Sequence, residues 1–308
     1  MYNKNITAAG AFAALLAFGS FSIGCTKPDK SDDFAKGDPP PVAGGFVNSS
    51  DVAPGSLVAH FPFEGSVNDA KGAVTGGTTN GTTSFIQGRK GQAYKGSANG
   101  FISYTTPGPI ATLQSFTISM WINTQKHGGG AQGVFMLAKQ DGSFWGNLFM
   151  MIEGHDLAAP VQTNRMFMKL HFEKNNAPFI EHWLEPHGFG TTDFRPDDMY
   201  GGWRHVAWTY DAATSKAGFY INGEKRGMPA GMEDRKADGT GAPLGALNFK
   251  NPTRFVIGAF QNQLGAPFNA PESWMLPYTG ALDEFRVYNK ALSAQEINAI
   301  AVLERQGR

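Results

Sequence analysis

The residues with the clearest binding chemistry in this sequence are aromatic and polar side chains in segments rich in turn-forming residues. Sugar rings stack their C–H faces on tryptophan, while nearby amides and carboxylates pair with the hydroxyl groups. One candidate side chain follows the polar turn at 141–143, and the others lie in two long segments, 174–201 and 261–278. We predict a carbohydrate-binding site that uses the following residues: Trp183, Trp274, Trp145 and His182. The alternative is that each aromatic side chain only fixes its own loop to the domain.

The motifs of common catalytic sites are absent from the sequence. It contains no Glu-x-Asp-x-x-Glu run, which supplies the paired carboxylates of sandwich-fold glycosidases, and no Gly-x-Ser-x-Gly motif. Asp283 and Glu284 are adjacent on an expected strand, so they should point to opposite faces. His182 and His187 flank Glu185 without the spacing of a helical zinc site. We therefore predict that the protein is not an enzyme.

Composition favours an all-β domain and excludes one class of partner. The 308 residues include 39 Gly and 18 Pro, with 12% aromatic and only 17% charged residues, a mixture typical of many short strands and turns. The formal net charge is +0 and no run of Lys or Arg stands out. Phosphate backbones are bound by clustered cations, so nucleic acid is not an expected partner.

The single cysteine lies where a lipid anchor would be attached. Residues 1–24 have the charged start, apolar centre and small-residue end of a secretory signal. The run Ser22-Ile23-Gly24-Cys25 resembles a bacterial lipobox, which implies acylation of Cys25. Residues 25–55 are rich in Pro, Gly, Ser and charge, and we expect a disordered tether there. The acidic stretch at 27–33 resembles tags of surface-exposed lipoproteins. We therefore expect the protein to be anchored in the outer membrane and exposed at the cell surface. A free cysteine near an ordinary cleavage site is the alternative.

From residue 56 onward, the pattern predicts one β-rich domain over 56–308 that ends in a short helix. Apolar and polar residues alternate over 116–123 and 166–173, as expected of half-buried strands. The pair Asn222-Gly223 suits the positive φ angles of a tight hairpin turn. Ser293 and Glu296 form a capping box ahead of the apolar positions of the helix.

Five sequence blocks in order resemble the LamG-like jelly-roll domain of the concanavalin A-like lectin/glucanase superfamily. They extend over about 57–300 and comprise 57–65 with 68–72, 88–93, 115–123, 203–211 with 219–223, and 280–293. The resemblance implies an antiparallel jelly-roll sandwich of two sheets, in agreement with the alternation pattern. The intervals 174–201, 226–252 and 261–278 are long between these blocks, and long loops on a rigid sandwich often carry binding sites.

The same resemblance implies a structural Ca²⁺ between the opening loop and the closing strand. Oxygen ligands suit this ion, and the matching positions are Glu64, Asp69 and Asp283. Glu64 stands where the family more often has Asp. The alternative is that these residues are surface carboxylates and an acid at a sheet edge.

Together these observations predict a lipid-anchored protein of the cell surface that binds a carbohydrate through loops of a LamG-like sandwich. Two alternatives remain. One is an adhesion module that binds a protein. The other is a glycan-active enzyme with an unrecognised site.

Overall fold

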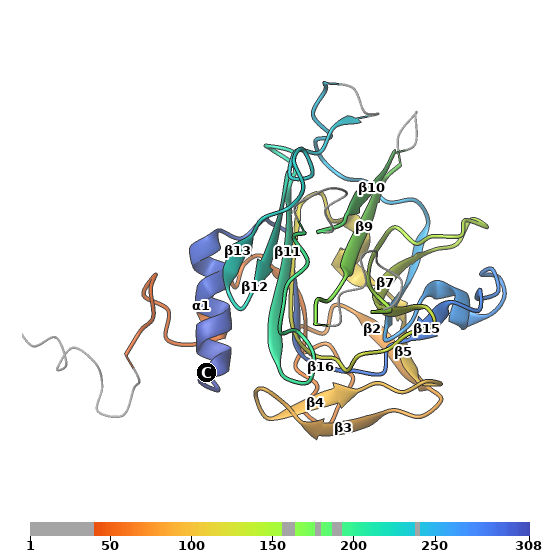
Figure 1. Cartoon of the computed structure of the whole chain (residues 1–308), viewed down its shortest axis with the longest axis horizontal. Helices are drawn as coiled ribbons and strands as arrows, with labels where there is room; N and C mark the ends of the chain where they lie inside the picture. The colour runs from red at the N-terminus through yellow and green to blue at the C-terminus, as the bar shows by residue number, and fades with distance from the viewer. Residues whose placement is uncertain (1–39, 156–163, 176–179, 187–192, 238–240) are drawn as a thin grey trace, which may run out of the picture. The chain divides into compact units, whose positions relative to one another are not determined.

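The structure, a computed structural model, describes residues 40–155, 164–175, 180–186, 193–237 and 241–308. Residues 41–308 form one compact unit, a sandwich of two sheets (Figure 1). Cys25 and the rest of residues 1–39 lie outside the described residues. Among the described residues, no helix has both the length and the apolar character needed to cross a membrane.

Each sheet has eight strands within the described residues. Sheet A contains, in spatial order, β13 (Glu224–Arg226), β12 (Lys216–Ile221), β11 (Arg204–Asp211), β6 (Phe116–Asn123), β16 (Ala281–Tyr288), β4 (Gln92–Lys95) and β3 (Ser84–Gln87), with β1 (Leu57–Phe61) also paired to β16. Sheet B contains β10 (Ile180–Leu184), β9 (Met168–Lys174), β8 (Leu148–Glu153), β7 (Ala131–Lys139), β14 (Pro252–Ile257), β5 (Phe101–Thr106) and β2 (Thr75–Asn80), with β15 (Met275–Pro277) parallel to β7. The other strand pairings are antiparallel, so the predicted two-sheet jelly-roll sandwich is confirmed.

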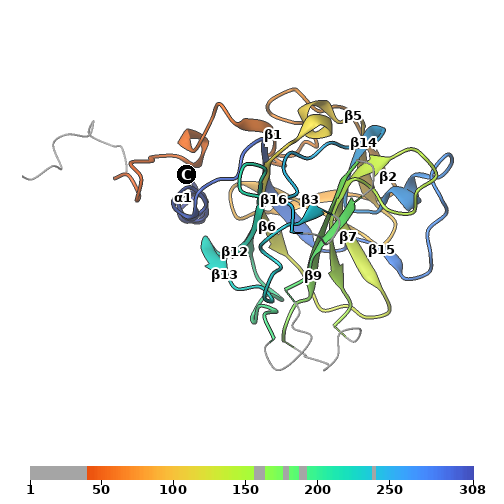
Figure 2. The ribbon, with the colours of Figure 1, turned by 90° about the horizontal axis from the view of Figure 1, so that it is seen from above.

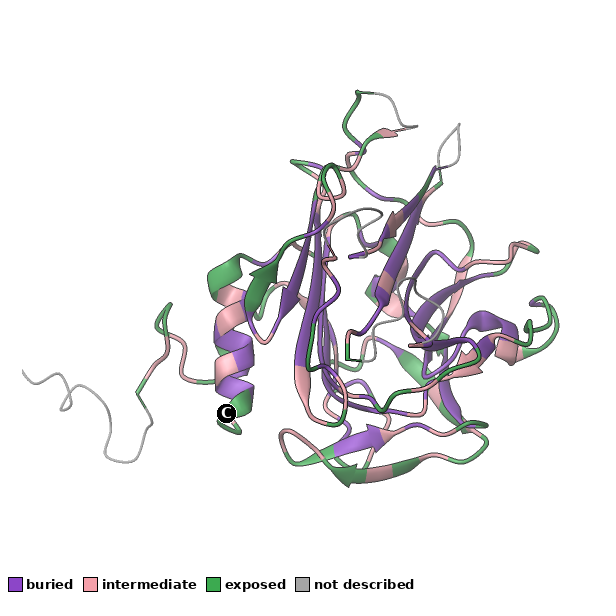
Figure 3. Ribbon diagram, in the orientation of Figure 1, coloured by how far each residue is buried: buried purple, intermediate pink, exposed green. Residues whose placement is uncertain are grey.

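The core lies between the two sheets because successive side chains of a strand point to opposite faces. On β9, Met168, Leu170 and Phe172 belong to the main core, whereas Lys169 and His171 face the other side of sheet B. Figure 3 shows how much of both sheets is buried. The outer face of sheet B is therefore free to carry a different set of side chains.

The helix α1 (Ala294–Arg305) covers the outer face of sheet A. Its predicted capping box is present, with Ser293 Oγ accepting a hydrogen bond from the Glu296 amide. Ile297, Ile300 and Leu303 are buried against Tyr220 and Tyr288. Figure 2 shows α1 on the side of β12 and β13 that faces away from sheet B. The Asn222-Gly223 turn has φ values of 54° and 86°, as predicted for the hairpin between β12 and β13.

The domain begins earlier than its expected start at residue 56. Val42, Phe46 and Val52 pack against the buried side of α1, next to the 3₁₀ turn η2 (Ser49–Asp51). The observed start differs from the expected one because these apolar residues are isolated in the sequence. The surface against which they pack exists only once the helix has folded. The compact unit therefore includes residues 41–55, which were expected to belong to the tether.

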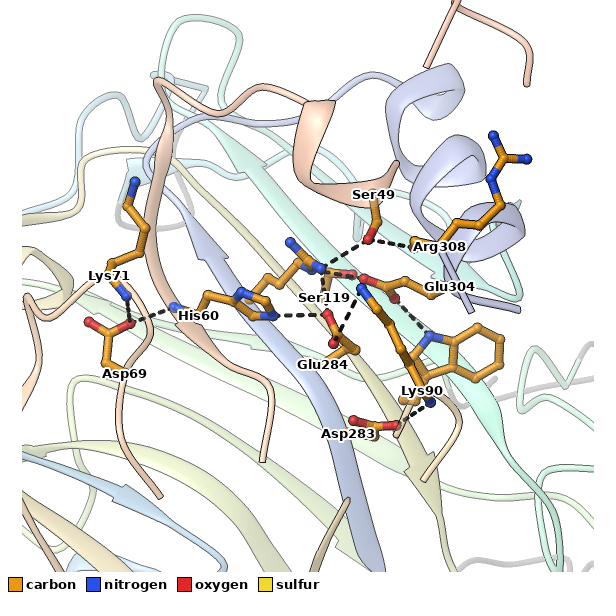
Figure 4. A network of polar contacts seen from close by, with 12 residues as sticks. Ser49, His60, Asp69, Lys71, Lys90, Ser119, Asp283, Glu284, Glu304 and Arg308 are labelled. Atoms are coloured by element: carbon orange, nitrogen blue, oxygen red, sulfur yellow. Dashed lines mark hydrogen bonds and ion pairs between the residues drawn. The ribbon is translucent and has the colours of Figure 1, made fainter. Parts of the chain in front are cut away.

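A buried ionic network fixes this cover to sheet A (Figure 4). Arg286 pairs with Glu284 on its own strand, and its Nε donates to Glu304 Oε1 of α1 over 2.8 Å. Glu304 Oε2 also accepts the indole N–H of Trp121 at 2.7 Å. Ser49 Oγ accepts from Arg286 at 3.1 Å and donates to the carbonyl of Arg308 at 2.9 Å. The first and last segments of the compact unit are thereby joined through one guanidinium group.

The expectation that Asp283 and Glu284 point to opposite faces is wrong. The pairing of β16 with β6 shifts between Asp283 and Arg286, where a β-bulge inserts an extra residue, and Glu284 has a φ of 48°. Leu282 and Phe285 on either side both belong to the core. The two acids between them both reach Lys90, through its backbone N–H and its ammonium group respectively.

Candidate functional site

Three of the predicted residues, Trp145, Trp183 and Trp274, meet on the outer face of sheet B. Their ring centroids lie 5.3 Å apart for Trp145 and Trp183 and 5.8 Å apart for Trp145 and Trp274. Each ring is partly buried. Trp183 was expected on a loop, but it lies on strand β10, whose alternation directs it outward. Trp145 lies in the β7–β8 loop, and Trp274 immediately precedes β15.

The loop that carries Trp145 is held by polar contacts at both ends of its turn. Asp141 accepts the Ser143 amide at 3.0 Å and pairs with Lys250 at 2.9 Å. Burial alone would raise the pKa of Asp141, but these contacts with Ser143 and Lys250 outweigh it and lower the pKa to about 2. Gln261 donates to the Ser143 carbonyl at 3.1 Å. The loop is thus attached to the 261–278 segment, so the two long loops are positioned together.

Trp274 is fixed through its backbone. Its carbonyl accepts the Ala131 amide at 2.8 Å, at the point where β15 begins to pair with β7. Gly130 leaves room for this approach, since a Cβ there would lie 2.2 Å from the Trp274 oxygen. A rigid strand edge therefore determines where the indole lies.

The tryptophans line a groove of about 430 Å³ together with Met151 and a charged cluster. Lys169 Nζ lies 2.8 Å from Glu153 and 3.3 Å from Glu185, and 5.9 Å from the centre of the Trp183 ring. All three charged side chains are partly exposed. An ammonium group and two carboxylates beside aromatic faces provide hydrogen-bond donors and acceptors next to stacking surfaces.

The floor beneath the groove contains a buried histidine. The His171 ring lies 4.5 Å from that of Trp183 and 4.6 Å from that of Phe149. Burial, and then the charge of Lys139, holds the pKa of His171 well below its ordinary value, so the imidazole is neutral. Lys139 itself donates to Glu173 at 2.6 Å. This floor supports the aromatic rings from below.

His182 does not belong to the groove. It alternates with Trp183 on β10 and faces the sandwich interior, where its ring stacks on Phe172 at 5.3 Å. Burial, and then Arg235 and Lys174, lowers its pKa to about 4. The prediction that it contacts sugar has no geometric support in this arrangement.

The three residues predicted to bind calcium have different surroundings. Both oxygens of Asp69 are occupied by backbone amides, those of His60, Lys71, Ala73 and Val74. Glu64 and Asp283 instead approach one turn, because Glu64 accepts the Gln92 amide at 2.9 Å and Asp283 accepts the Lys90 amide at 2.8 Å. Asp283 Oδ1 is buried and makes no hydrogen bond within the described part of the chain. Glu64 and Asp283 thus fit a cation better than Asp69, which organises the loop.

A second arrangement of metal-binding residue types lies on β9 and β10. His171, Glu173 and Glu181 each place one potential ligand atom within 4.8 Å of the other two. The Lys139 ammonium occupies one oxygen of Glu173, however. Burial raises the pKa of Glu173 to about 7, against the effect of Lys139. These residues were not predicted as a group.

Sequence reasoning missed the charged half of the groove: Glu153, Lys169 and Glu185. Alternation along β8 and β9 places Glu153 and Lys169 on the outer face, and this signal was present in the sequence. The strand register decides which of these outer-face residues become neighbours, and it places Met151 opposite Lys169. Alternation along a single strand does not predict that register.

The structure is similar to several solved structures of low sequence identity. Domain 4 of AbnA, a GH43 extracellular arabinanase from Geobacillus stearothermophilus, was solved with arabinotriose; it is 18% identical, with 80% of this chain and 98% of that chain covered and a TM-score of 0.49. Botulinum neurotoxin type C is 13% identical, with 84% and 53% covered and a TM-score of 0.53. The type G binding domain is 14% identical, with 80% and 51% covered and a TM-score of 0.51.

These likenesses concern the fold, and the chain spans about half the length of the toxin chains that it matches. No curated protein matches the chain in sequence. A family model does match, over residues 95–298, which is more than half of the chain. On this match and the observed sandwich, the chain belongs to the concanavalin A-like lectin/glucanases superfamily.

Proposed function

We propose that the protein binds a carbohydrate in the groove on the outer face of sheet B. The observation that carries this proposal is the convergence of Trp145, Trp183 and Trp274 from three separate segments onto one 430 Å³ groove. Rings that only pinned their own loops would not need to share one partly exposed surface. The cell entry of botulinum neurotoxin type C depends on ganglioside molecules, so a glycan ligand has a precedent among proteins containing this fold.

The charges in the groove favour a neutral glycan. Two carboxylates, Glu153 and Glu185, face one ammonium group, Lys169, so the lining carries a net negative charge. An acidic sugar would meet this charge unfavourably, whereas neutral hydroxyl groups can both donate to the carboxylates and accept from the ammonium. Lys169 also holds the two carboxylates in place before any ligand arrives.

Glycan binding is tested by screening the purified full chain on a glycan array and measuring the affinity of the best neutral ligand by calorimetry. We expect Trp183→Ala and Trp274→Ala each to weaken binding about tenfold or more, since a buried aromatic anchor typically contributes more than ~1.4 kcal/mol. Phe85→Ala is the matched control, because Phe85 is also a partly buried aromatic residue but lies outside the groove. If both groove variants bound like the control, the site assignment would be wrong.

The two alternatives have their own outcomes in the same experiments. A chain that binds no glycan but retains a defined surface protein would be an adhesion module. Release of product from a bound polysaccharide would indicate an enzyme. The pair Asp283 and Glu284, now seen on one face, is an unsuitable catalytic pair because both side chains are buried.

Anchoring at the outer membrane through Cys25 remains a separate proposal, supported by the lipobox-like run Ser22-Ile23-Gly24-Cys25. Cys25→Ser should abolish incorporation of labelled palmitate and move the protein from the membrane fraction to the soluble one. Protease treatment of intact cells should then remove the wild-type domain if it is displayed outside. Unchanged labelling in Cys25→Ser would contradict the anchor.

Structural calcium is proposed at the turn that Glu64 and Asp283 approach, where the buried Asp283 Oδ1 lacks a hydrogen-bond partner among the described residues. We expect Ca²⁺ to raise the melting temperature of the wild type but not of Asp283→Asn. Asp69→Asn should be less stable with or without Ca²⁺, since it loses loop contacts. Equal melting temperatures of the wild type in Ca²⁺ and in chelator would refute the site.

A further inference from the structure

A second concave site, of about 580 Å³, lies on the other side of the sandwich and collects four arginines. They come from separate parts of the chain: Arg89, Arg204, Arg226 and Arg305. The last two belong to β13 and α1, which lie side by side in Figures 1 and 2. We call this site the arginine pocket. None of its residues belongs to the tryptophan groove.

Two of the guanidinium groups are oriented by backbone carbonyls. Arg204 donates to the carbonyls of Asp198 at 2.5 Å and Trp203 at 3.0 Å. Arg89 donates to the carbonyl of Arg305 and lies 5.4 Å from the centre of the Trp121 ring. Carbonyl groups fix the direction of a guanidinium but do not neutralise its charge. These two guanidinium groups are therefore held in place while their positive charge remains.

Among the residues that the structure describes, the four arginines also lack carboxylate partners. Within the described residues, none of them forms an ion pair, and the Nε atom of Arg89 is buried without a hydrogen-bond partner. Acidic residues do line the pocket, but Asp197 pairs with Arg165 at 3.0 Å, and Asp198 and Glu224 are exposed. Guanidinium groups that converge on one concavity without a carboxylate partner point to an anion supplied from outside.

We propose that the arginine pocket binds an acidic sugar unit, carboxylated or sulfated, of a polysaccharide. A guanidinium presents parallel N–H groups that match the two oxygens of a carboxylate or sulfate, and such pairs are among the strongest protein hydrogen bonds. Trp203, partly exposed at the pocket, adds an aromatic face on which a sugar ring can stack. The volume suits one or two sugar units.

This site is independent of the groove. The pocket should prefer an acidic sugar, whereas the groove should prefer a neutral one. The groove lining is net negative, whereas the pocket lining carries four arginines and three acidic residues. A polysaccharide with neutral and acidic units could occupy both sites. A purely neutral one would use the groove alone.

The test measures binding of polygalacturonate and dextran sulfate to the full chain by calorimetry, with neutral dextran as the uncharged probe. Arg226 and Arg305 are exposed, and their side chains form no hydrogen bond or ion pair within the described residues, so Arg226→Gln/Arg305→Gln should fold normally. We expect this double variant to weaken binding of at least one acidic polymer about tenfold or more. The charge-matched control is Arg254→Gln/Lys236→Gln, which lies outside the pocket.

Comparison of the two acidic polymers distinguishes a carboxylate from a sulfate ligand. Trp183→Ala should leave acidic binding unchanged, which separates this site from the groove. The proposal is overturned if neither acidic polymer binds, if the pocket variant and the charge control weaken binding equally, or if a DNA duplex of similar charge binds as tightly. The last two results would indicate nonspecific attraction of polyanions.

Discussion

Three histidines, His171, His182 and His205, are enclosed among aromatic side chains and strands, and burial is the first cause of a lowered pKa in each. For His205 the pKa falls to about 3, with Arg305 and Arg286 adding to the effect. Its Nε2 lies 2.8 Å from Ser119 Oγ. These imidazoles remain neutral in the folded protein at pH values where they would be charged in the unfolded chain.

His205 should therefore make stability depend on pH. A folded pKa of about 3 against an ordinary value of 6.5 means that the unfolded chain binds more protons, so stability falls as pH falls from about 6.5 towards 3. Between pH 7 and pH 5 this residue should lower the free energy of unfolding by about 2 kcal/mol. His205→Gln, which can keep the contact with Ser119, should lose that much less over the same interval. Urea unfolding at the two pH values measures the difference, and parallel losses would contradict it.

At the scale of elements, the groove depends on how strand ends and loops are joined. β15 pairs with β7 in parallel and delivers Trp274, while Gln261 of the 3₁₀ turn η5 (Gln261–Leu264) holds the loop of Trp145. β10 supplies Trp183 as part of sheet B. The tryptophans are thus positioned by the edge and outer face of one sheet.

Gly130→Ala tests this positioning without touching a tryptophan. A Cβ at Gly130 would lie 2.2 Å from the Trp274 carbonyl oxygen, so the backbone that carries this indole must shift. We expect glycan affinity to fall about tenfold, the loss of one anchor, with a changed near-ultraviolet circular dichroism of the coupled indoles. Gly241→Ala, where a Cβ meets nothing within 4 Å, is the control. Wild-type spectra and affinity in Gly130→Ala would show that Trp274 is not positioned this way.

Much of the fold and part of the site could be predicted from the sequence. Alternation over 116–123 and the capping box at Ser293 are local patterns, and both appear as strand and helix start. The convergence of Trp145 on Trp274 is non-local, because it depends on hydrogen bonds between two loops. The bulge at Asp283 was missed because an inserted residue breaks the alternation on which the prediction relied.

Across the whole molecule, the outer faces of the two sheets differ in kind. Sheet A is covered by α1 and by residues 42–52, joined through Arg286 and Glu304, whereas sheet B leaves its tryptophans partly exposed. Burial raises the pKa of Glu304. The ion pair with Arg286 and the hydrogen bond from the Trp121 indole oppose this shift, because both stabilise the charged carboxylate. The ends of the compact unit thus depend on one buried pair.

Removing Glu304 should therefore destabilise the entire unit. Glu304→Ala leaves Arg286 and the indole N–H of Trp121 without this acceptor in a buried place. The expected loss is about 3 kcal/mol or more, as for other buried pairs broken on one side. Glu233→Ala, which removes the more exposed ion pair with Lys225, should cost less than about 1 kcal/mol. Chemical unfolding compares the two, and equal losses would contradict the role given to the network.

The cover on sheet A also decides how the protein can be handled. The chain enters the compact unit at Val42, beside α1, while the tryptophans lie on the outer face of the opposite sheet. A sensor chip that captures the protein through residues before Pro41 should leave the tryptophans open to the flowing solution. Coupling through the side-chain amine of Lys169 would instead turn the groove towards the chip, and the captured protein should no longer bind a neutral glycan.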